Sequence, residues 1–434
     1  MKKILLSTLI AAASFVTLAG QAHAGTTLDA VKKKGFVQCG ISDGLPGFSY
    51  ADSKGKFTGI DVDLCRAVAA AVFGDAEKVK YTPLTAKERF TALQSGEVDI
   101  LSRNTTWTSS RDAGMGMIFA GVNYYDGIGF LTHQKAGLKS AKELDGATVC
   151  LQAGTDTELN VADYFKANKM TYTPVTFDRS DESAKALDSG RCDTLASDQS
   201  QLYALRIKLG KPDEFIVLPE VISKEPLGPV VRRGDEDWLA VVRWSLYAML
   251  NAEEMGVTSA NVDQLAANPT TPDMSNLLGK TGTYGADLKV PNDWVVKIVK
   301  QVGNYGESFE RNVGQGSELK IKRGQNALWN KGGIQYAPPV RAISLVPDVE
   351  KCLRMLMHRP FPGASLPGFY LQVEVNNVAT PNRKGFVLAD QPGSPRLDLP
   401  NFRGGVAGSL SRLPSPQHHY QSDYTRDHLG ICVS

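Results

Sequence analysis

Histidines, closely spaced cysteines and long apolar segments are all rare in this chain of 434 residues. Between residues 25 and 341, His133 is the only histidine, and no two cysteines have the C-x-x-C spacing that is typical of metal sites. A phosphate loop of the Walker type is also missing. We therefore expect no metal ion, no cofactor and no phosphoryl-transfer activity.

The sequence also lacks a basic excess. Its formal net charge is +2, and residues 25–341 carry −2, because residues 1–24 and residues 342–434 each contribute +2. Proteins that bind nucleic acids usually have a surplus of lysine and arginine. We therefore expect no nucleic-acid partner.

The first 24 residues have the pattern of a cleaved signal peptide. Lys2 and Lys3 precede an apolar run over residues 4–19, and Ala22-His23-Ala24 places small residues where a signal peptidase cuts. A membrane anchor is the alternative, but the run is short for a hydrocarbon layer of about 30 Å. No later segment reaches about 18 consecutive apolar residues. We expect an exported, water-soluble protein that begins at Gly25.

An exported chain with six cysteines can form disulfides. Cys150 and Cys192 are the best candidate pair, because both lie in strand-like runs of one predicted lobe. Cys39 and Cys65 are a second pair. The alternative is that these cysteines are buried free thiols that act as small apolar side chains.

Short β-rich runs alternate with amphipathic segments over residues 25–341, which is typical of an α/β fold. Residues 36–40 predict a first strand. Residues 60–73 predict a helix, because Ile60, Leu64 and Val68 recur with helical spacing, and Gly74 is expected to end it.

An internal repeat is the most informative pattern. Residues 92–102 (ALQSGEVDILS) recur almost position for position as residues 186–196 (ALDSGRCDTLA). Each copy predicts a helix end, a left-handed glycine and then a strand that runs into polar residues. Ligands bind at the carboxyl edge of such strands in open α/β sheets.

Two similar units predict two lobes around a cleft, joined by a two-stranded hinge. We expect residues 25–130 and 226–341 to form lobe 1 and residues 131–225 to form lobe 2. The crossovers are expected at residues 129–134 and 221–230. Residues 237–256 predict an amphipathic helix in the core of lobe 1.

Residues 342–434 differ from the rest of the chain. They contain ten of the 22 prolines, four of the six histidines and none of the five tryptophans, with no sustained periodicity. We interpret them as a disordered tail, and read-through past a lost stop codon would explain it. A third domain is the alternative.

Polar side chains follow both repeated strands and suit a ligand that carries a carboxylate next to an ammonium group. In lobe 1, Arg111 can grip a carboxylate, Thr106 can donate its hydroxyl, and the Asn104 carbonyl can accept from an ammonium group. In lobe 2, Gly154 and Thr155 lie at a predicted helix start that suits a carboxylate.

Asp198, just after the second repeated strand, can accept from the ammonium group. Each residue also has a structural explanation. Arg111 could be a surface guanidinium, Asp198 an N-cap, and Gly154-Thr155 a simple capped helix start. The joint occurrence at matching strand ends favours a binding site.

From about residue 25 to residue 341, the chain resembles the polar amino-acid-binding proteins of ABC importers, of the general L-amino-acid-binding type. The motifs that carry the resemblance are Gly59-Ile60-Asp61-Val62-Asp63-Leu64, Ser102-Arg103-Asn104-Thr105-Thr106 with Arg111, Leu151-Gln152-Ala153-Gly154-Thr155, Ser197-Asp198, Pro226-Leu227-Gly228-Pro229 and Gln335-Tyr336-Ala337-Pro338-Pro339. The resemblance does not extend to the tail.

The resemblance implies a type II periplasmic binding fold, with Arg111 and Thr106 on the ligand carboxylate and Asp198 on its ammonium group. It implies that the ligand side chain is surrounded by Ser42, Leu45, Phe48, Arg89, Arg103 and Gln152. We expect a periplasmic, monomeric binding protein that accepts several L-amino acids, including Glu, Gln, Asp and Asn, and delivers them to a membrane permease. The alternatives are an enzyme of the same fold, such as a dehydratase, and a ligand-sensing module.

Overall fold

The computed structural model describes residues 27–341, 373–374 and 387–388 of the chain. The predicted signal peptide and nearly all of the predicted tail lie outside these residues. The chain divides into two compact units, residues 1–342 and 343–434. In the second unit the described residues form one antiparallel pair, β15 (Val373–Glu374) with β16 (Val387–Leu388). Within the described residues, no helix combines the length and apolarity that a membrane span needs.

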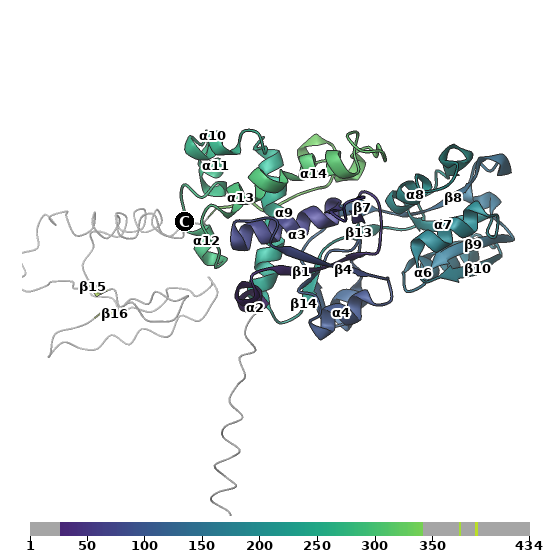
Figure 1. Ribbon diagram of the computed structural model, residues 1–434, viewed down its shortest axis with the longest axis horizontal. Coiled ribbons are helices and arrows are strands. Elements are labelled where there is room, and N and C mark those ends of the chain that lie inside the picture. Colours follow the sequence, from purple (N-terminus) through teal and green to yellow (C-terminus); the bar gives the residue numbers. More distant parts are fainter. Residues whose placement is uncertain (1–26, 342–372, 375–386, 389–434) are drawn as a thin grey trace, which may run out of the picture. The chain divides into compact units, whose positions relative to one another are not determined.

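The first unit contains two five-stranded sheets, each in its own lobe (Figure 1). The lobe 1 sheet has the order β4-β1-β5-β14-β6. In this order, its strands are Val79–Leu84, Val37–Ser42, Ile100–Leu101, Val230–Arg232 and Met117–Phe119. The first three strands are parallel, and β14 runs antiparallel to both of its neighbours.

The lobe 2 sheet has the order β10-β9-β11-β8-β12. Its strands, in this order, are Tyr172–Phe177, Ala147–Gln152, Thr194–Asp198, Ile128–His133 and Phe215–Val217. Again three parallel strands are followed by an antiparallel one. The two lobes therefore share one topology, which confirms the predicted α/β fold.

The repeated segments occupy equivalent places in the two sheets. In lobe 1, helix α4 (Arg89–Ser95) is followed by Gly96 with φ 81° and then by β5. In lobe 2, helix α7 (Ser180–Asp188) is followed by Gly190 with φ 75° and then by β11. The predicted sequence of helix, left-handed glycine and central strand is confirmed in both copies.

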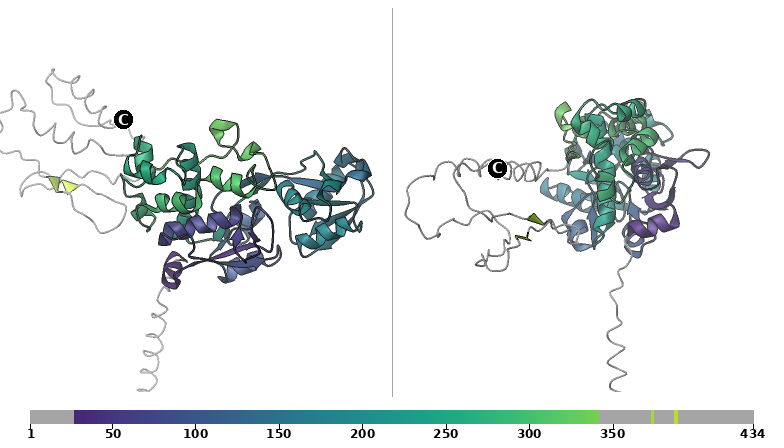
Figure 2. Two further views of the ribbon diagram at one scale, coloured as in Figure 1. Left: turned by 45° about the horizontal axis from the view of Figure 1, so that its top comes forward. Right: turned by 90° about the vertical axis from the view of Figure 1, so that its left-hand side faces the viewer.

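Lobe 1 is the larger lobe and has a helical layer over its sheet (Figures 1 and 2). The predicted helix over residues 60–73 is confirmed as α3, with Gly74 at φ 69° as its C-cap. The predicted core helix is α9 (Glu236–Glu254), whose Trp238 is fully buried and donates from Nε1 to the Asp99 carbonyl at 2.8 Å. The other helices and strands of lobe 1 are α2 (Thr27–Lys34), α5 (Ser109–Gly114), α10 (Val262–Ala267), α11 (Pro272–Leu277), α12 (Tyr284–Asp287), α13 (Trp294–Val302), α14 (Tyr305–Asn312), β2 (Tyr50–Ala51) and β3 (Phe57–Thr58).

Helices α6 (Thr157–Ala167) and α8 (Gln199–Arg206) join α7 in lobe 2. Two apolar clusters form its core, with Phe215 and Leu187 fully buried in one and Phe130 and Val161 in the other. Short 3-10 turns complete the described chain at Gln134–Ala136, Ala141–Glu143, Pro212–Glu214, Gly324–Asn326 and Trp329–Lys331.

Two antiparallel strands, β7 (Tyr124–Asp126) and β13 (Glu225–Leu227), join the lobes. The return crossover therefore lies inside the predicted range, but the first crossover precedes residues 129–134. Those residues belong instead to β8, in the lobe 2 sheet. The physical reason is that Ile128–Thr132 is fully buried, as suits a sheet strand and not an exposed connection.

Gly228, directly after β13, packs against the chain that leads into β7. A Cβ at this position would lie 1.9 Å from the carbonyl oxygen of Gly121, so any other residue would force the segments apart. The Gly228 N–H also donates to the Thr105 carbonyl at 3.0 Å. The crossover is thereby attached to the loop that follows β5.

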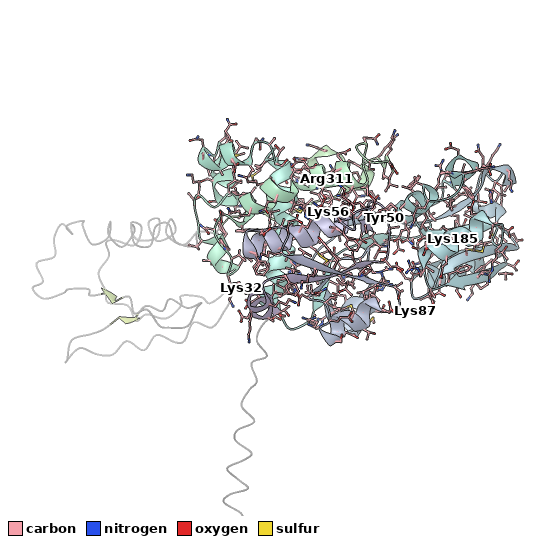
Figure 3. The ribbon with its side chains drawn as sticks, in the orientation of Figure 1. Lys32, Tyr50, Lys56, Lys87, Lys185 and Arg311 are labelled. Carbon is pink, nitrogen blue, oxygen red and sulfur yellow. A yellow bond between two sulfur atoms is a disulfide. The ribbon has the colours of Figure 1, made fainter. Side chains whose placement is uncertain are left out.

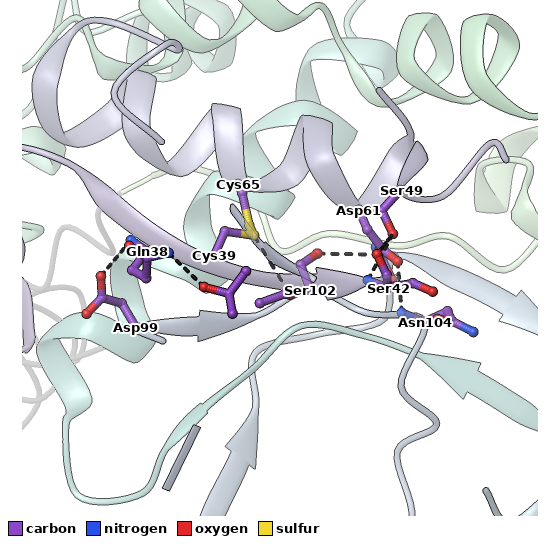
Figure 4. Close-up of a disulfide and its surroundings, with 12 residues drawn as sticks. Gln38, Cys39, Ser42, Ser49, Asp61, Cys65, Asp99, Ser102 and Asn104 are labelled. Carbon is purple, nitrogen blue, oxygen red and sulfur yellow. Dashed lines mark hydrogen bonds between the residues drawn. A yellow bond between two sulfur atoms is a disulfide. The ribbon is translucent and has the colours of Figure 1, made fainter. Parts of the chain in front are cut away.

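Both cysteine pairs named from the sequence form disulfides in the structure. Cys39–Cys65 connects β1 to α3, and Cys150–Cys192 connects β9 to the segment just before β11 (Figure 4 shows the first pair). Each bond therefore joins a sheet strand of one lobe to a neighbouring segment of the same lobe.

Candidate ligand-binding site

A pocket lies between the two lobes, at the carboxyl ends of β5 and β11. The space between its lining residues, counted together with the solvent open to it, is about 290 Å³. Lobe 1 lines it with Arg89, Arg103, Asn104 and Thr106, and lobe 2 with Gln152, Thr155, Asp156, Thr157, Ser197, Asp198 and Gln201. Every one of these side chains is polar or charged, which suits a small polar ligand.

The lobe 1 side of the pocket is the loop after β5, and Asp61 holds it in place (Figure 4). Asp61 accepts hydrogen bonds from the backbone N–H of Asn104 at 2.8 Å, the Ser102 hydroxyl at 3.4 Å and the Asn123 amide at 3.0 Å. Asn104 has φ +30°, an unusual conformation outside glycine that these contacts support. From the sequence, Asp61 was noted only as part of the motif over residues 59–64, with no role in a pocket.

Asn104 presents an unused acceptor to the pocket. Its Nδ2 donates to Gln201 Oε1 across the cleft at 3.1 Å, whereas its buried Oδ1 accepts no hydrogen bond from the described residues. A buried polar atom without a partner costs free energy. Asn104 Oδ1 is therefore suited to accept a hydrogen bond from a ligand.

Arg89 and Arg103 give the pocket a positive pole. Their exposed fractions are only 2% and 3%. Arg103 donates from Nε to the Leu84 carbonyl at 2.9 Å, and its Nη2 lies 4.0 Å from the Asp43 carboxylate. Arg89 donates from Nη1 to the Thr105 hydroxyl at 3.5 Å, its Cζ lies 4.7 Å from the centroid of the Phe90 ring, and its Nε has no acceptor among the described residues.

Burial lowers the pKa of both guanidinium groups, and for Arg89 the neighbouring charge of Arg103 lowers it further. Among the described residues, Arg89 has no carboxylate within ion-pair distance, and Arg103 has only Asp43, at 4.0 Å, so both buried charges are incompletely compensated. An anionic group of a ligand would supply that compensation.

Arg111 is buried, with an exposed fraction of 7%, so it is not a surface guanidinium. Its Nη1 donates to the Thr106 carbonyl at 2.9 Å, and its Nη2 donates to the Asp156 carboxylate of lobe 2 at 3.2 Å. Arg111 is not among the residues that line the pocket. Its guanidinium instead contacts Thr106 and Asp156, and both of these residues line the pocket.

The lobe 2 side is built from the turn after β9 and the start of α6. Gly154 has φ 78°, and a Cβ there would lie 2.9 Å from the Lys87 side chain and 3.2 Å from the Lys87 backbone nitrogen. The Thr155 hydroxyl donates to the Gln152 carbonyl at 2.7 Å. Asp156 is the N-cap residue of α6, but its side chain does not cap the helix. The N–H groups at this helix start thus stay available for an anion.

Asp198 ends β11 and is the N-cap residue of α8, yet its carboxylate makes no capping hydrogen bond. Burial raises its pKa well above the usual range, and the negative charges of Asp126, Glu225 and Asp156 raise it further. An empty pocket therefore favours the protonated acid. A cationic group next to Asp198 would reverse that preference.

Four lining residues were not predicted: Asp156, Thr157, Ser197 and Gln201. Gln201 donates to Gln152 Oε1 at 3.5 Å and accepts from Asn104, so it connects the two lobes across the pocket. Its position three residues after Asp198, on the first turn of α8, is the sequence signal that could have identified it.

Three residues that the resemblance placed around the ligand side chain do not line the pocket. Phe48 and Leu45 are almost fully buried in the lobe 1 core, where the Phe48 ring packs edge-on against Tyr124 with centroids 5.3 Å apart. Ser42 lies at the end of β1, and its backbone N–H donates to the Ser49 hydroxyl at 3.0 Å. The loop over residues 42–49 folds back on itself, which turns these side chains inward.

Further ion pairs join the rims of the two lobes. Asp43 of lobe 1 pairs with Arg179 of lobe 2 at 2.9 Å, and Lys87 pairs with Asp178 at 2.5 Å (Lys87 is labelled in Figure 3). Lys208 of lobe 2 also donates to the Gly44 carbonyl at 3.1 Å. These contacts hold the lobes together around the pocket.

Several known proteins are similar to this chain in sequence and fold. Residues 37–260 match the bacterial extracellular solute-binding proteins, family 3. A protein of Escherichia coli O157:H7, provisionally named an amino-acid ABC transporter-binding protein, is 81% identical over 341 residues, which are 79% of this chain and 100% of that protein. The general L-amino acid-binding periplasmic protein of Rhizobium johnstonii is 59% identical over 343 residues, or 79% of this chain and 100% of that protein.

A solved structure of an ABC transporter periplasmic binding protein from Brucella ovis with glutathione bound is also similar. It is 59% identical, with a TM-score of 0.72 over 73% of this chain and 100% of that one. The match over more than half of the chain, together with these identities, shows that the chain belongs to the bacterial extracellular solute-binding proteins, family 3.

Proposed function

We propose that this chain is the periplasmic binding component of an ABC importer, that it captures free L-amino acids of several kinds, and that it delivers them to the membrane permease. Glu, Gln, Asp and Asn are among the expected ligands. The observation that carries the proposal is the pocket's pair of opposite poles, with buried Arg89 and Arg103 on one lobe and Asp198 on the other. The similarity to the Rhizobium johnstonii protein supports the same ligand class.

The charged groups of a free amino acid fit the two poles. Removing its ammonium and carboxylate from water costs several kcal/mol each unless both are paired. We assign the ammonium group to Asp198 and to the acceptor oxygens of Asn104. We assign the carboxylate to Thr106, to the N–H groups at Thr155 and Thr157, and to Arg111, for which it would compete with Asp156.

The ligand side chain then lies toward Arg89, Arg103 and Gln152. Two buried guanidinium groups favour a second carboxylate or an amide oxygen, so we expect a preference for acidic and amide side chains. The amide side chains of Gln152 and Gln201, which are hydrogen-bonded to each other, can donate to a carboxylate or pair with an amide. Apolar contacts alone discriminate between ligands by only about 1 to 3 kcal/mol per methylene, so we expect the site to accept several amino acids.

A second candidate ligand is glutathione, which carries two carboxylates and one ammonium group and is bound in the Brucella ovis structure. The unpaired Arg89 guanidinium is the specific observation in its favour, because a distant second carboxylate would neutralise it.

An enzymatic function has less support. The residues Gly40-Ile41-Ser42-Asp43-Gly44 match the letters of the G-x-S-x-G turn found at hydrolase nucleophiles. The Ser42 hydroxyl, however, contacts the Asp43 carboxylate at 3.5 Å, and the only histidine among the described residues, His133, is on the lobe 2 strand β8. We therefore propose binding without turnover.

Calorimetry with a panel of L-amino acids and glutathione tests the proposal, on the chain that lacks residues 1–24. We expect micromolar or tighter binding of several amino acids, which is about 8 kcal/mol or more. Arg191→Ala, at an exposed position of lobe 2, is a control that should leave binding unchanged. Conversion of a ligand into a product during the titration would favour the enzyme, and an absence of binding would refute the proposal.

A further inference from the structure

Two acidic residues are register partners on the strands that join the lobes. Asp126 of β7 is the antiparallel partner of Glu225 of β13. Glu225 has an exposed fraction of 1%. Its Oε1 accepts from the Ser223 hydroxyl at 2.5 Å and from Asn160 Nδ2 at 3.4 Å, whereas its Oε2 has no hydrogen-bond partner among the described residues.

Asp126 connects this pair to the pocket. Its Oδ2 accepts from the backbone N–H of Ser200 at 3.2 Å, on the first turn of the helix that begins directly after Asp198. Its Oδ1 accepts from the Gly127 N–H at 2.9 Å. Helix α8 is therefore capped by a carboxylate from the hinge, which leaves the carboxylate of Asp198 free to face a ligand.

Four carboxyl groups thus converge where the crossovers enter lobe 2: Asp126, Asp156, Asp198 and Glu225. The negative charges of the other three raise the pKa of Asp198, and the charge of Asp156 also raises the pKa of Glu225. The cations that face the group are Arg111, 3.2 Å from Asp156, and Arg89 and Arg103, which act on Asp198 at longer range. The nearby Thr106 hydroxyl lowers the pKa of Glu225. The other titratable neighbours are Tyr124 and Tyr203, and the raised pKa of Tyr124 keeps it neutral.

This arrangement has more buried negative charge than its cations offset. Like charges held close together in a buried space cannot all ionise, so such a group keeps a proton at a pH where isolated carboxyl groups have lost theirs. Burial and the neighbouring carboxylates raise the pKa of Glu225 to about 7, and burial raises that of Asp126 to about 6. A ligand ammonium group beside Asp198 would add the missing positive charge.

We infer that Asp126 and Glu225 are part of the ligand site, and that with Asp156 and Asp198 they form a carboxyl cluster that gives up a proton to solvent when it takes up the ammonium group of a ligand. This inference rests on the proposed function. The exchange is balanced in charge: one proton leaves for the buffer as one cationic group enters. Asp126 and Glu225 act through Asp198 and are positioning residues that adjust its charge.

The exchange has a consequence for ligand choice. A ligand without a cationic group next to its carboxylate cannot displace the proton, so α-hydroxy acids and N-acetylated amino acids should be rejected. Affinity for an accepted ligand should also fall at acidic pH. Where one full proton is released, the dissociation constant rises about tenfold for each pH unit below the pKa of the cluster.

Calorimetry in two buffers with different ionisation enthalpies measures the released protons directly. L-glutamine is a suitable probe, because its own groups do not titrate near pH 6.5. We expect the wild-type protein to release a substantial fraction of one proton per ligand in phosphate and imidazole buffers. Glu225→Gln should reduce that number and flatten the dependence of affinity on pH.

Glu220→Gln is the matched control. Glu220 lies five residues before Glu225 on the same return segment, but its carboxylate accepts from Ser140 and from the Ala141 N–H, outside the cluster. This variant should release the same number of protons as the wild type. Asp126→Asn is a second test variant, and thermal melting of each variant identifies any that fail to fold.

Wild-type binding without proton release would overturn the inference, even if both variants failed to fold. Unchanged proton release in folded Glu225→Gln and Asp126→Asn variants would also overturn it. Either result leaves amino-acid binding intact. If the wild type instead binds no amino acid at any pH, the proposed function fails, and this is a distinguishable outcome.

Discussion

The guanidinium of Arg111 in lobe 1 lies 3.2 Å from the carboxylate of Asp156 in lobe 2. The protein itself therefore places a carboxylate where the ligand carboxylate is proposed to bind. Arg111 thus has two proposed partners: Asp156 in the empty pocket and the ligand in the occupied one. Any ligand must compete with this internal ion pair.

We expect Arg111→Ala to weaken the binding of all amino-acid ligands to a similar extent, by about 2 to 5 kcal/mol, because it removes a buried charged partner.

Asp156→Asn should have a different effect. It removes one negative charge next to the pocket, so L-glutamate should gain affinity relative to L-glutamine. Calorimetry with both ligands measures this ratio, and an unchanged ratio would show that Asp156 does not act on the ligand.

Arg103→Ala should change the order of ligands and not their common affinity. The guanidinium of Arg103 is proposed to contact the ligand side chain, so its loss should weaken acidic ligands by about 1.5 to 3 kcal/mol more than small neutral ones. Competition binding with L-glutamate and L-alanine checks this. Equal losses of affinity for the two ligands would indicate that Arg103 contacts the α-carboxylate that both ligands share.

Asp61→Ala should weaken both stability and binding, because three donors lose their acceptor: the Asn104 N–H, Ser102 and Asn123. Leaving buried donors unsatisfied costs about 1 to 3 kcal/mol for each group. Asp52→Ala is the control, since Asp52 caps an exposed turn through Lys54 and Lys56. Thermal melting and calorimetry measure the two effects. Full ligand affinity in a folded Asp61→Ala variant would contradict the role assigned to Asp61.

The stability of the ligand-free protein should depend on pH through the carboxyl cluster. The pKa values of Asp126 and Glu225 are raised to about 6 and about 7, whereas unfolded aspartate and glutamate titrate near about 3.9 and 4.3. Between about pH 4 and pH 7 the folded state therefore binds more protons than the unfolded state, so this contribution to stability falls as pH rises.

The difference between wild type and Glu225→Gln isolates this term from all other titrating groups. Wild-type Tm should drop more steeply than the variant's Tm between about pH 5 and pH 8. Scanning calorimetry without ligand measures both slopes. Parallel slopes would mean that Glu225 is ionised throughout that range.

Local patterns predicted the fold well. The spacing of Ile60, Leu64 and Val68 and the stop at Gly74 located α3, and the repeat located the two central strands. The first crossover was placed too late, because an apolar run such as Ile128–His133 fits either a connecting strand or a sheet strand, and only its pairing with β11 decides.

The site was predicted where side chains follow a repeated strand and was missed where contacts are long-range. Asn104, Thr106 and Asp198 come directly after β5 or β11 and line the pocket. Asp126 and Glu225 are about a hundred residues apart in sequence, and only the pairing of β7 with β13 brings them together. No local pattern reports such a pairing. Phe48, which the resemblance places beside the ligand, packs in the lobe 1 core of the structure, and the fold of its loop is a further feature that no local pattern reports.

The contact between Gly228 and Gly121 has a mechanical consequence. Backbone meets backbone there with no side chain between them, because a Cβ on Gly228 would lie 1.9 Å from the Gly121 carbonyl oxygen. A larger residue at position 228 would push apart the chain before β7 and the chain after β13, which lead into the two strands that join the lobes. We therefore expect the relative placement of the lobes to be sensitive to substitution of this one glycine.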